Sequence, residues 1–242
     1  MKKQIWGCLL LGALAGVTLA GNAITYEIDG EKFEGYVEKG APGAPMVFLI
    51  HDWDGLTDYE VKRSGMLAEL GYSVFSIDLY GKGVRPTEMS DKKKCMTILT
   101  EDRPKMRSYM KGALAFAKEQ GLNTENCVAM GYCFGGTAVL ELARSGDKLK
   151  GFATFHGGLA LPDGQDYSKV SGEFLIMHST TDGMDDFSAL AGSLEKAGVG
   201  SQMVTYSGAP HGWTVFDRRA YREKQDKQSW KLFSEFLEDV LK

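Results

Sequence analysis

The sequence predicts an α/β protein whose mainly parallel, doubly wound sheet carries helices on both faces. Short apolar runs such as 46–50 alternate with longer segments of helical spacing such as 59–70, a pattern typical of parallel strands joined by crossover helices. Several of these runs end in glycine and polar residues, as at 51–55. Parallel sheets build their sites at the carboxyl ends of strands, so we expect the functional residues there.

Residues 1–23 have the pattern of a secretory signal peptide. The basic residues Lys2 and Lys3 precede an apolar run from Leu9 to Ala20, and small residues follow. We expect cleavage after Ala20 or Ala23 and export of the protein, which would then be periplasmic or secreted. The run is short for a transmembrane helix, which takes about 18 apolar residues or more, so no stable membrane insertion is expected after cleavage. An uncleaved membrane anchor is the alternative.

The remaining residues, 24–242, are expected to form a single domain and to act as a monomer. Their number suits one large α/β domain with a sizeable core. The formal charge of the whole chain is −4 and acidic and basic residues are interspersed, which disfavours nucleic acid as a partner. The sequence lacks Cys-x-x-Cys, His-Glu-x-x-His and calcium-loop patterns, so we expect neither a metal nor another cofactor.

The first elements follow from apolar patterns and their stop signals. Large apolar residues on both sides of Asp29 and Gly30 predict an antiparallel edge hairpin over 24–37. The continuous apolar run 46–50 predicts a strand buried on both faces. The amphipathic segment 59–70 stops at Gly71, which is typical of a helix end.

A polar segment, 85–107, follows the next predicted strand at 72–77. It contains Pro86 and Pro104 and predicts a surface excursion with one short helix over 90–99, placed to cover the site. The remaining elements are expected, in order, as helix 105–120, strand 126–130, helix 137–144, strands 149–155 and 173–178, helix 188–197, strand 201–206 and helix 221–241.

A single thiol lies between glycines where a predicted strand meets a predicted helix, in the segment Gly131-Tyr132-Cys133-Phe134-Gly135. Such an elbow needs glycines because the central residue has strained backbone geometry and the strand and helix approach closely. The helix N-terminus favours a thiolate at Cys133 and a developing oxyanion beside it. The pattern therefore suits acyl transfer, and the alternative is a structural cysteine beside a glycine turn.

A thiol nucleophile needs a base and an orienting acid, and Cys133, Asp182 and His211 have the order found in sheets of this kind. Each follows a predicted strand, so all three should reach the same sheet edge. Asp182 is preferred to Asp185 and Asp186 because it is nearest the strand end. The other histidines are His51, His156 and His178, of which the last two are expected to be hydrogen-bonded at the sheet rim.

The mature chain would contain three cysteines, an odd number for an exported protein. Cys95 lies in the excursion and Cys127 at the start of the strand before the elbow. We expect these two at opposite ends of the sheet, too far apart for the usual Cα separation of about 4.4–6.8 Å in a disulfide. No disulfide is therefore predicted.

With these residues the sequence resembles the dienelactone hydrolase family, a branch of the α/β-hydrolase fold that uses cysteine in place of serine. The resemblance implies catalytic roles for Cys133, Asp182 and His211, and an oxyanion hole from the backbone N–H groups of Trp53 and Phe134. It rests on segments spread through the mature chain: His51-Asp52-Trp53-Asp54-Gly55-Leu56, Asp78-Leu79-Tyr80-Gly81, Gly131-Tyr132-Cys133-Phe134-Gly135-Gly136, Asp182 and His211-Gly212-Trp213.

The resemblance also implies substrate contacts, and here the sequence departs from the family. Asp52 holds the place where the family usually has a glutamate that contacts the resting thiol. Two arginines bind the substrate carboxylate in the type enzyme. The position of the first arginine corresponds to the neighbourhood of Lys82, with Arg85 close by. The position of the second corresponds to a stretch that starts with Trp213 and has no basic residue before Arg218. An altered clamp is therefore expected, with a pocket that accepts more apolar acyl groups and only weakly prefers anionic ones.

The activity expected from these residues is hydrolysis of a small-molecule ester or lactone through a thioester on Cys133. A catalytically idle protein of the same fold, acting in binding or in a stress response, is the alternative. Reaction of one fast thiol with iodoacetamide and the loss of turnover with it would distinguish the two.

Overall fold

The computed structural model describes residues 21–241 and contains one eight-stranded sheet. Strands β3 to β8 run parallel to one another, whereas β1 and β2 form an antiparallel hairpin that joins β4 at the edge. The strand order is β1-β2-β4-β3-β5-β6-β7-β8. The strands are β1 (Asn22–Ile28), β2 (Glu31–Glu38), β3 (Pro45–Ile50), β4 (Ser73–Ile77), β5 (Asn123–Tyr132), β6 (Gly151–Phe155), β7 (Glu173–Ser179) and β8 (Ser201–Tyr206).

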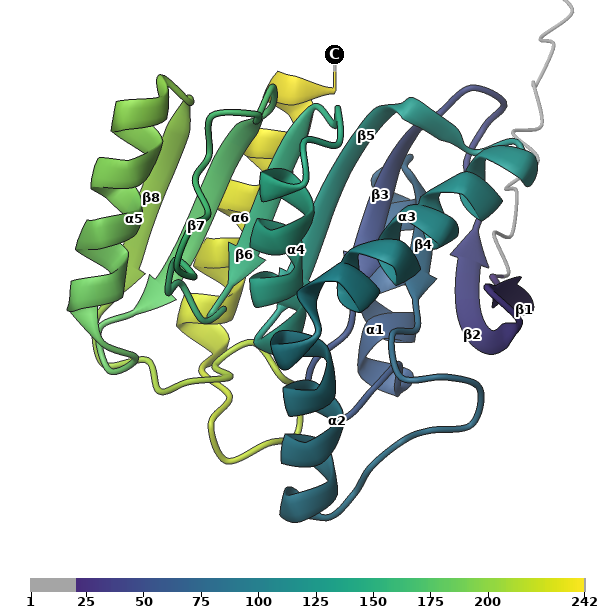
Figure 1. The fold of residues 1–242 in the computed structure, drawn as a ribbon, viewed down its shortest axis with the longest axis horizontal. Helices are drawn as coiled ribbons and strands as arrows, with labels where there is room; N and C mark the ends of the chain where they lie inside the picture. The colour runs from purple at the N-terminus through teal and green to yellow at the C-terminus, as the bar shows by residue number, and fades with distance from the viewer. Residues whose placement is uncertain (1–20, 242) are drawn as a thin grey trace, which may run out of the picture.

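Helices cover both faces of the sheet, as Figure 1 shows, with α3, α4 and α5 on the near face and α1 and α6 on the far face. Each face has its own apolar core, one against α3, α4 and α5 and the other against α1 and α6. The helices are α1 (Asp58–Glu69), α2 (Met89–Glu101), α3 (Arg103–Glu119), α4 (Phe134–Arg144), α5 (Met184–Ala197) and α6 (Glu223–Val240). The predicted doubly wound α/β fold is confirmed.

The carboxyl ends of β3, β5, β6, β7 and β8 meet at one edge of the sheet. The chain leaves β3 toward β4 on one side and later returns to place β5 on the other side, so the winding reverses between β3 and β5. Such a reversal opens a crevice at the strand ends. In Figure 1, α2 and the loop between β8 and α6 both lie beyond this edge. A functional site is therefore expected in this crevice.

The observed boundaries differ from the predicted ones by a few residues: α3 and α4 begin earlier, whereas β6 and α6 begin later. Helix α3 begins at Arg103, since the Asp102 carboxylate accepts the Lys105 N–H at 3.0 Å and Pro104 fits the first turn. Helix α4 begins at Phe134, directly after the elbow residue. The excursion contains the expected helix, α2, although it is longer than 90–99.

No helix within residues 21–241 is long and apolar enough to cross a membrane. The predicted signal segment lies almost entirely outside the described residues, and β1 begins at Asn22, before the second of the two expected cleavage points. Cys95 lies on α2 and Cys127 is buried in β5; like Cys133, both have free thiols.

Candidate active site

The turn between β5 and α4 holds Cys133 in a strained backbone conformation. Its φ is +51° and ψ is −113°, in a region that residues with a side chain rarely adopt. The Cys133 N–H donates to the Phe155 carbonyl at 2.9 Å, which ties the turn to the end of β6. A Cβ on Gly131 would lie 2.2 Å from the Gly135 carbonyl carbon, and only glycine allows this approach. The turn therefore has the nucleophile elbow geometry that the sequence predicts.

The structure brings His211 and Asp182 to Cys133 from two separate loops. His211 Nε2 lies 3.0 Å from Cys133 Sγ, and His211 Nδ1 lies 2.8 Å from Asp182 Oδ2. Ser179, at the end of β7, donates its hydroxyl to the Ala209 carbonyl and so joins the loop of Asp182 to the loop of His211. Cys133, His211 and Asp182 therefore form the continuous chain of contacts that a nucleophile, base and orienting acid require.

The electrostatics of this chain favour a neutral thiol at rest. Burial raises the pKa of Cys133 well above its ordinary value, and the charge and hydrogen bond of Asp52 raise it further, against the lowering effect of the Phe134 N–H. Burial lowers the pKa of His211, but the hydrogen bond and charge of Asp182, together with the charge of Asp52, outweigh it, so the net pKa is raised. The imidazole is thereby suited to take up a proton from the thiol.

Asp52 is one methylene shorter than the glutamate that the resemblance implies at this position, yet its charge and hydrogen bond act on the Cys133 thiol. Burial, helped by the charge of Asp54, raises the pKa of Asp52 to about 6. Its Oδ1 also accepts the backbone N–H of Trp53, one of the two groups expected in the oxyanion hole. The backbone of Asp52 is itself held by Glu60 of α1, whose Oε1 accepts the Asp52 N–H at 3.3 Å. Asp52 thus occupies the Trp53 half of the hole in this state.

A pocket of about 270 Å³ opens beside Cys133 and His211. Its size suits a short acyl or alcohol group. Within residues 21–241, no group of three or more histidine, cysteine or acidic side chains is arranged to hold a metal ion. The residues that line the pocket are Asp52, Trp53, Cys133, His211, Gly212, Val215, Arg218 and Ala220.

Lys82 and Arg85, the expected carboxylate clamp, do not line this pocket. Gly81 and Gly83 both have positive φ and turn the chain toward β2, where Glu34 supplies an opposite charge. Lys82 Nζ lies 3.9 Å from Glu34 and Arg85 Nη2 lies 3.6 Å from the same carboxylate. The arrangement of these two residues thus differs from the expected one, because Glu34 of β2 attracts both of them, and Arg85 is also held by the Leu56 carbonyl and by Asp78.

Trp213, also expected to contact the substrate, is fully buried and does not line the pocket. Its ring packs against Tyr206 at 5.3 Å and against His156 at 5.0 Å between centroids. Its indole contributes to the core on the α6 side and leaves Val215 of the same loop to line the pocket. The sequence places Trp213 correctly beside His211 but does not reveal the direction of its side chain.

The other three histidines are buried and hydrogen-bonded. His51 Nε2 accepts the Leu79 N–H at 3.0 Å, His156 Nε2 lies 2.8 Å from Thr214 Oγ1, and His178 Nε2 lies 3.0 Å from the Gly183 carbonyl oxygen. Burial and the nearby His211 lower the pKa of His156 well below its ordinary value. For His156 and His178 the expected role at the sheet rim is confirmed.

Sequence reasoning missed a group of charges at the edge of the pocket. Asp54 Oδ2 is contacted by Arg218 Nη2 and lies 3.4 Å from Lys92 Nζ of α2. Arg218 is noticeable in the sequence as the first cation after His211. Nothing in the sequence singles out Lys92 among the neighbouring lysines, since only the packing of α2 decides which of them faces inward.

Comparison with known proteins identifies the family of this chain. The model of the dienelactone hydrolase family matches residues 33–241. Protein usf of Aquifex pyrophilus is 27% identical over 236 residues, which cover 91% of this chain and 99% of that protein. A solved structure named m3DLH is 28% identical with a TM-score of 0.85 and covers 93% of this chain and 99% of its own.

A second solved structure has a similar fold at lower sequence identity. It is a dienelactone hydrolase-like promiscuous phosphotriesterase from metagenomic libraries, 22% identical with a TM-score of 0.83, over 92% of this chain and 98% of its own. The family match extends over most of the chain and includes the elbow and the loops of Asp182 and His211. The chain therefore belongs to the dienelactone hydrolase family and is a hydrolase of carboxylic esters or lactones.

Proposed function

We propose that the protein hydrolyses small esters or lactones through a thioester on Cys133. The observation that carries this proposal is the chain of contacts from Cys133 Sγ to His211 at 3.0 Å and from His211 to Asp182 at 2.8 Å. A thiol with a raised pKa is a weak nucleophile, so it needs a base within hydrogen-bond reach. His211 supplies this base and the pocket supplies room for a small substrate.

The first half of the reaction forms the acyl-enzyme. His211 takes the thiol proton as Sγ attacks the carbonyl carbon, and the carbonyl π electrons move onto the oxygen. In this proposal the Phe134 and Trp53 N–H groups stabilise that oxyanion. As the intermediate collapses, the carbon–oxygen bond to the alcohol breaks and His211 returns the proton to the leaving oxygen. Asp182 holds the imidazole and stabilises its charged form.

The second half regenerates the thiol. His211 removes a proton from water as the water oxygen attacks the thioester carbon, and the carbon–sulfur bond then breaks. The thiolate regains its proton from His211 and the carboxylic acid is released. Asp52 must leave the Trp53 N–H in both halves, because its Oδ1 accepts that hydrogen bond at rest. When the substrate binds, its carbonyl oxygen therefore displaces the Asp52 carboxylate from the Trp53 N–H.

Turnover of a chromogenic acetate ester, followed during alkylation, tests the proposed function. Iodoacetamide should label Cys133 and abolish hydrolysis in parallel, whereas labelling of Cys95 on α2 should leave hydrolysis unchanged. Peptide mass spectrometry assigns each label and a panel of esters and lactones then ranks the substrates. A protein that hydrolyses none of them, although folded, would instead be the idle binding protein.

We also propose that the protein is exported after signal cleavage following Ala20. Cleavage there leaves β1 whole, whereas cleavage after Ala23 would remove Asn22 and Ala23, which pair with Val37 and Tyr36 of β2. A full-length chain expressed in a bacterium with a secretion pathway should be recovered outside the cytoplasm, and N-terminal sequencing should begin at Gly21. A mature chain that begins at Met1 would contradict the proposal.

A further inference from the structure

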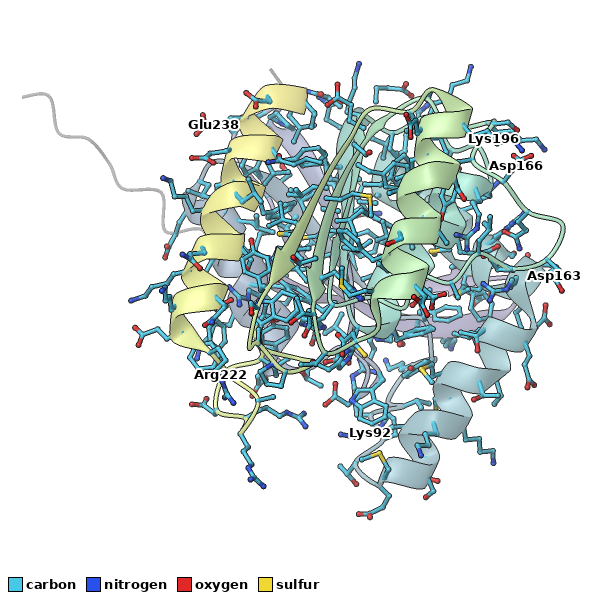
Figure 2. The ribbon with its side chains drawn as sticks, turned by 90° about the vertical axis from the view of Figure 1, so that its left-hand side faces the viewer. Lys92, Asp163, Asp166, Lys196, Arg222 and Glu238 are labelled. Atoms are coloured by element: carbon cyan, nitrogen blue, oxygen red, sulfur yellow. The ribbon has the colours of Figure 1, made fainter. Side chains whose placement is uncertain are left out.

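Asp54 binds two cations at the rim of the catalytic pocket. Its carboxylate contacts Arg218, from the loop between β8 and α6, and lies 3.4 Å from Lys92 of α2. Figure 2 shows Lys92 on α2 next to the carboxyl ends of the strands. The side chains of Asp54 and Lys92 are each only 10% exposed, so water screens this pair weakly. Three segments far apart in the sequence therefore meet at one acidic group.

Arg218 is the one cation among the residues that line the pocket, within the part of the chain that the structure describes. Its guanidinium has the geometry to bind a substrate carboxylate, but its Nη2 already donates to Asp54 Oδ2, and the rest of the half-exposed side chain lies beside that negative charge. Asp52, the other charged group on the wall besides His211, is acidic. A carboxylated substrate would thus compete with one acid for Arg218 and face a second acid beside Cys133.

We propose that Asp54 is a specificity-determining residue that makes the pocket select uncharged acyl groups. It does so by taking the place that a substrate carboxylate would take on Arg218, with Lys92 fixing its position. This inference rests on the proposed ester hydrolysis and names the substrate class as neutral short esters or lactones. It replaces the weak preference for anionic substrates that Lys82 and Arg85 suggested, since neither of those residues lines the pocket.

The test compares kcat/KM for two esters that share a leaving group, one with a neutral acyl chain and one with a terminal carboxylate. The wild type should favour the neutral ester, and Asp54→Asn should shift the ratio toward the carboxylate by about tenfold, the value of one charge-assisted hydrogen bond. Adding Arg218→Gln to Asp54→Asn should remove the shift. Arg218→Gln alone should increase discrimination against the carboxylate, because Asp54 then faces the rim with only Lys92 to neutralise it.

Glu34→Gln is the matched control, because it removes the same charge from an acid that pairs with Lys82 and Arg85, neither of which lines the pocket. It should leave the ratio unchanged. An unchanged ratio in Asp54→Asn, or an equal shift in Glu34→Gln, overturns the proposal. Changes in the catalytic step itself cancel in the ratio, because both esters pass through the same chemistry at Cys133.

A second readout is independent of turnover. Anionic iodoacetate and neutral iodoacetamide both alkylate Cys133, and peptide mass spectrometry gives the two rates, with glutathione as the reference thiol. Relative to glutathione, the wild type should disfavour iodoacetate, and Asp54→Asn should reduce this discrimination severalfold. If neither ester is hydrolysed but this ratio shifts, the proposed function fails and the role of Asp54 stands. If esters are hydrolysed and neither ratio shifts, only the role of Asp54 fails.

Discussion

Replacing Cys133 with alanine is expected to lower kcat/KM for ester hydrolysis by at least about a thousandfold, which corresponds to about 4 kcal/mol in the barrier. The variant lacks the sulfur that forms the proposed thioester, and His211, which lies 3.0 Å from that sulfur in the wild type, then has no thiol to deprotonate. His211→Ala should cost about as much, since nucleophile and base act as a unit. The measurement is initial-rate kinetics with a chromogenic ester.

Asp182→Asn should also lower kcat/KM by several orders of magnitude, because Asp182 holds the imidazole of His211 through the 2.8 Å contact to Nδ1. Cys95→Ala is the matched control: it removes a thiol of α2 that does not line the catalytic pocket, and it should keep full activity. A folded Cys133→Ala variant that retains more than about a tenth of wild-type activity would exclude the thioester mechanism.

Gly135→Ala is expected to lower the free energy of unfolding by about 3 kcal/mol or more, at the upper end of single substitutions. A Cβ at this position would lie 2.2 Å from the Ile50 carbonyl oxygen and 2.6 Å from that of His51. Both obstacles are backbone atoms at the end of β3, so no side-chain rotation relieves the clash. The first turn of α4 would have to move away from β3 and carry Cys133 with it. Urea unfolding followed by circular dichroism measures the loss.

Gly192→Ala is the control for the glycine substitution. Gly192 lies inside α5, and a Cβ there meets no atom within 4 Å. Alanine should therefore raise stability by about 0.5–1 kcal/mol, because it favours the helix. A loss below about 1 kcal/mol in Gly135→Ala would show that α4 can shift without cost and that the tight elbow is not required for folding.

The sequence by itself predicts the sheet, most of its helices and the meeting of Cys133, Asp182 and His211. Each of these three follows a segment that becomes a strand of the sheet, buried in β5 and β7 and largely exposed in β8, and parallel strands bring their carboxyl ends to one edge whatever their separation in the chain. The glycines around Cys133 are likewise visible in the sequence. The positive φ at Cys133 is a local property of the turn, whereas the close approach of Gly135 to β3 is a tertiary contact. The glycine pattern is therefore visible in the sequence, and the packing of α4 against β3 explains why Gly135 is required.

Only the tertiary structure decided which charged side chains border the pocket. Lys82 follows the end of its strand as closely as His211 does, yet Lys82 lies near Glu34 of β2, and Arg85 contacts Glu34, Asp78 and the Leu56 carbonyl. Arg218 and Lys92 instead meet at Asp54. Long flexible cations pair with whichever acid the packing brings near, and that acid comes from another segment of the chain. The position of a strand end is encoded locally, whereas the partner of a loop side chain is not.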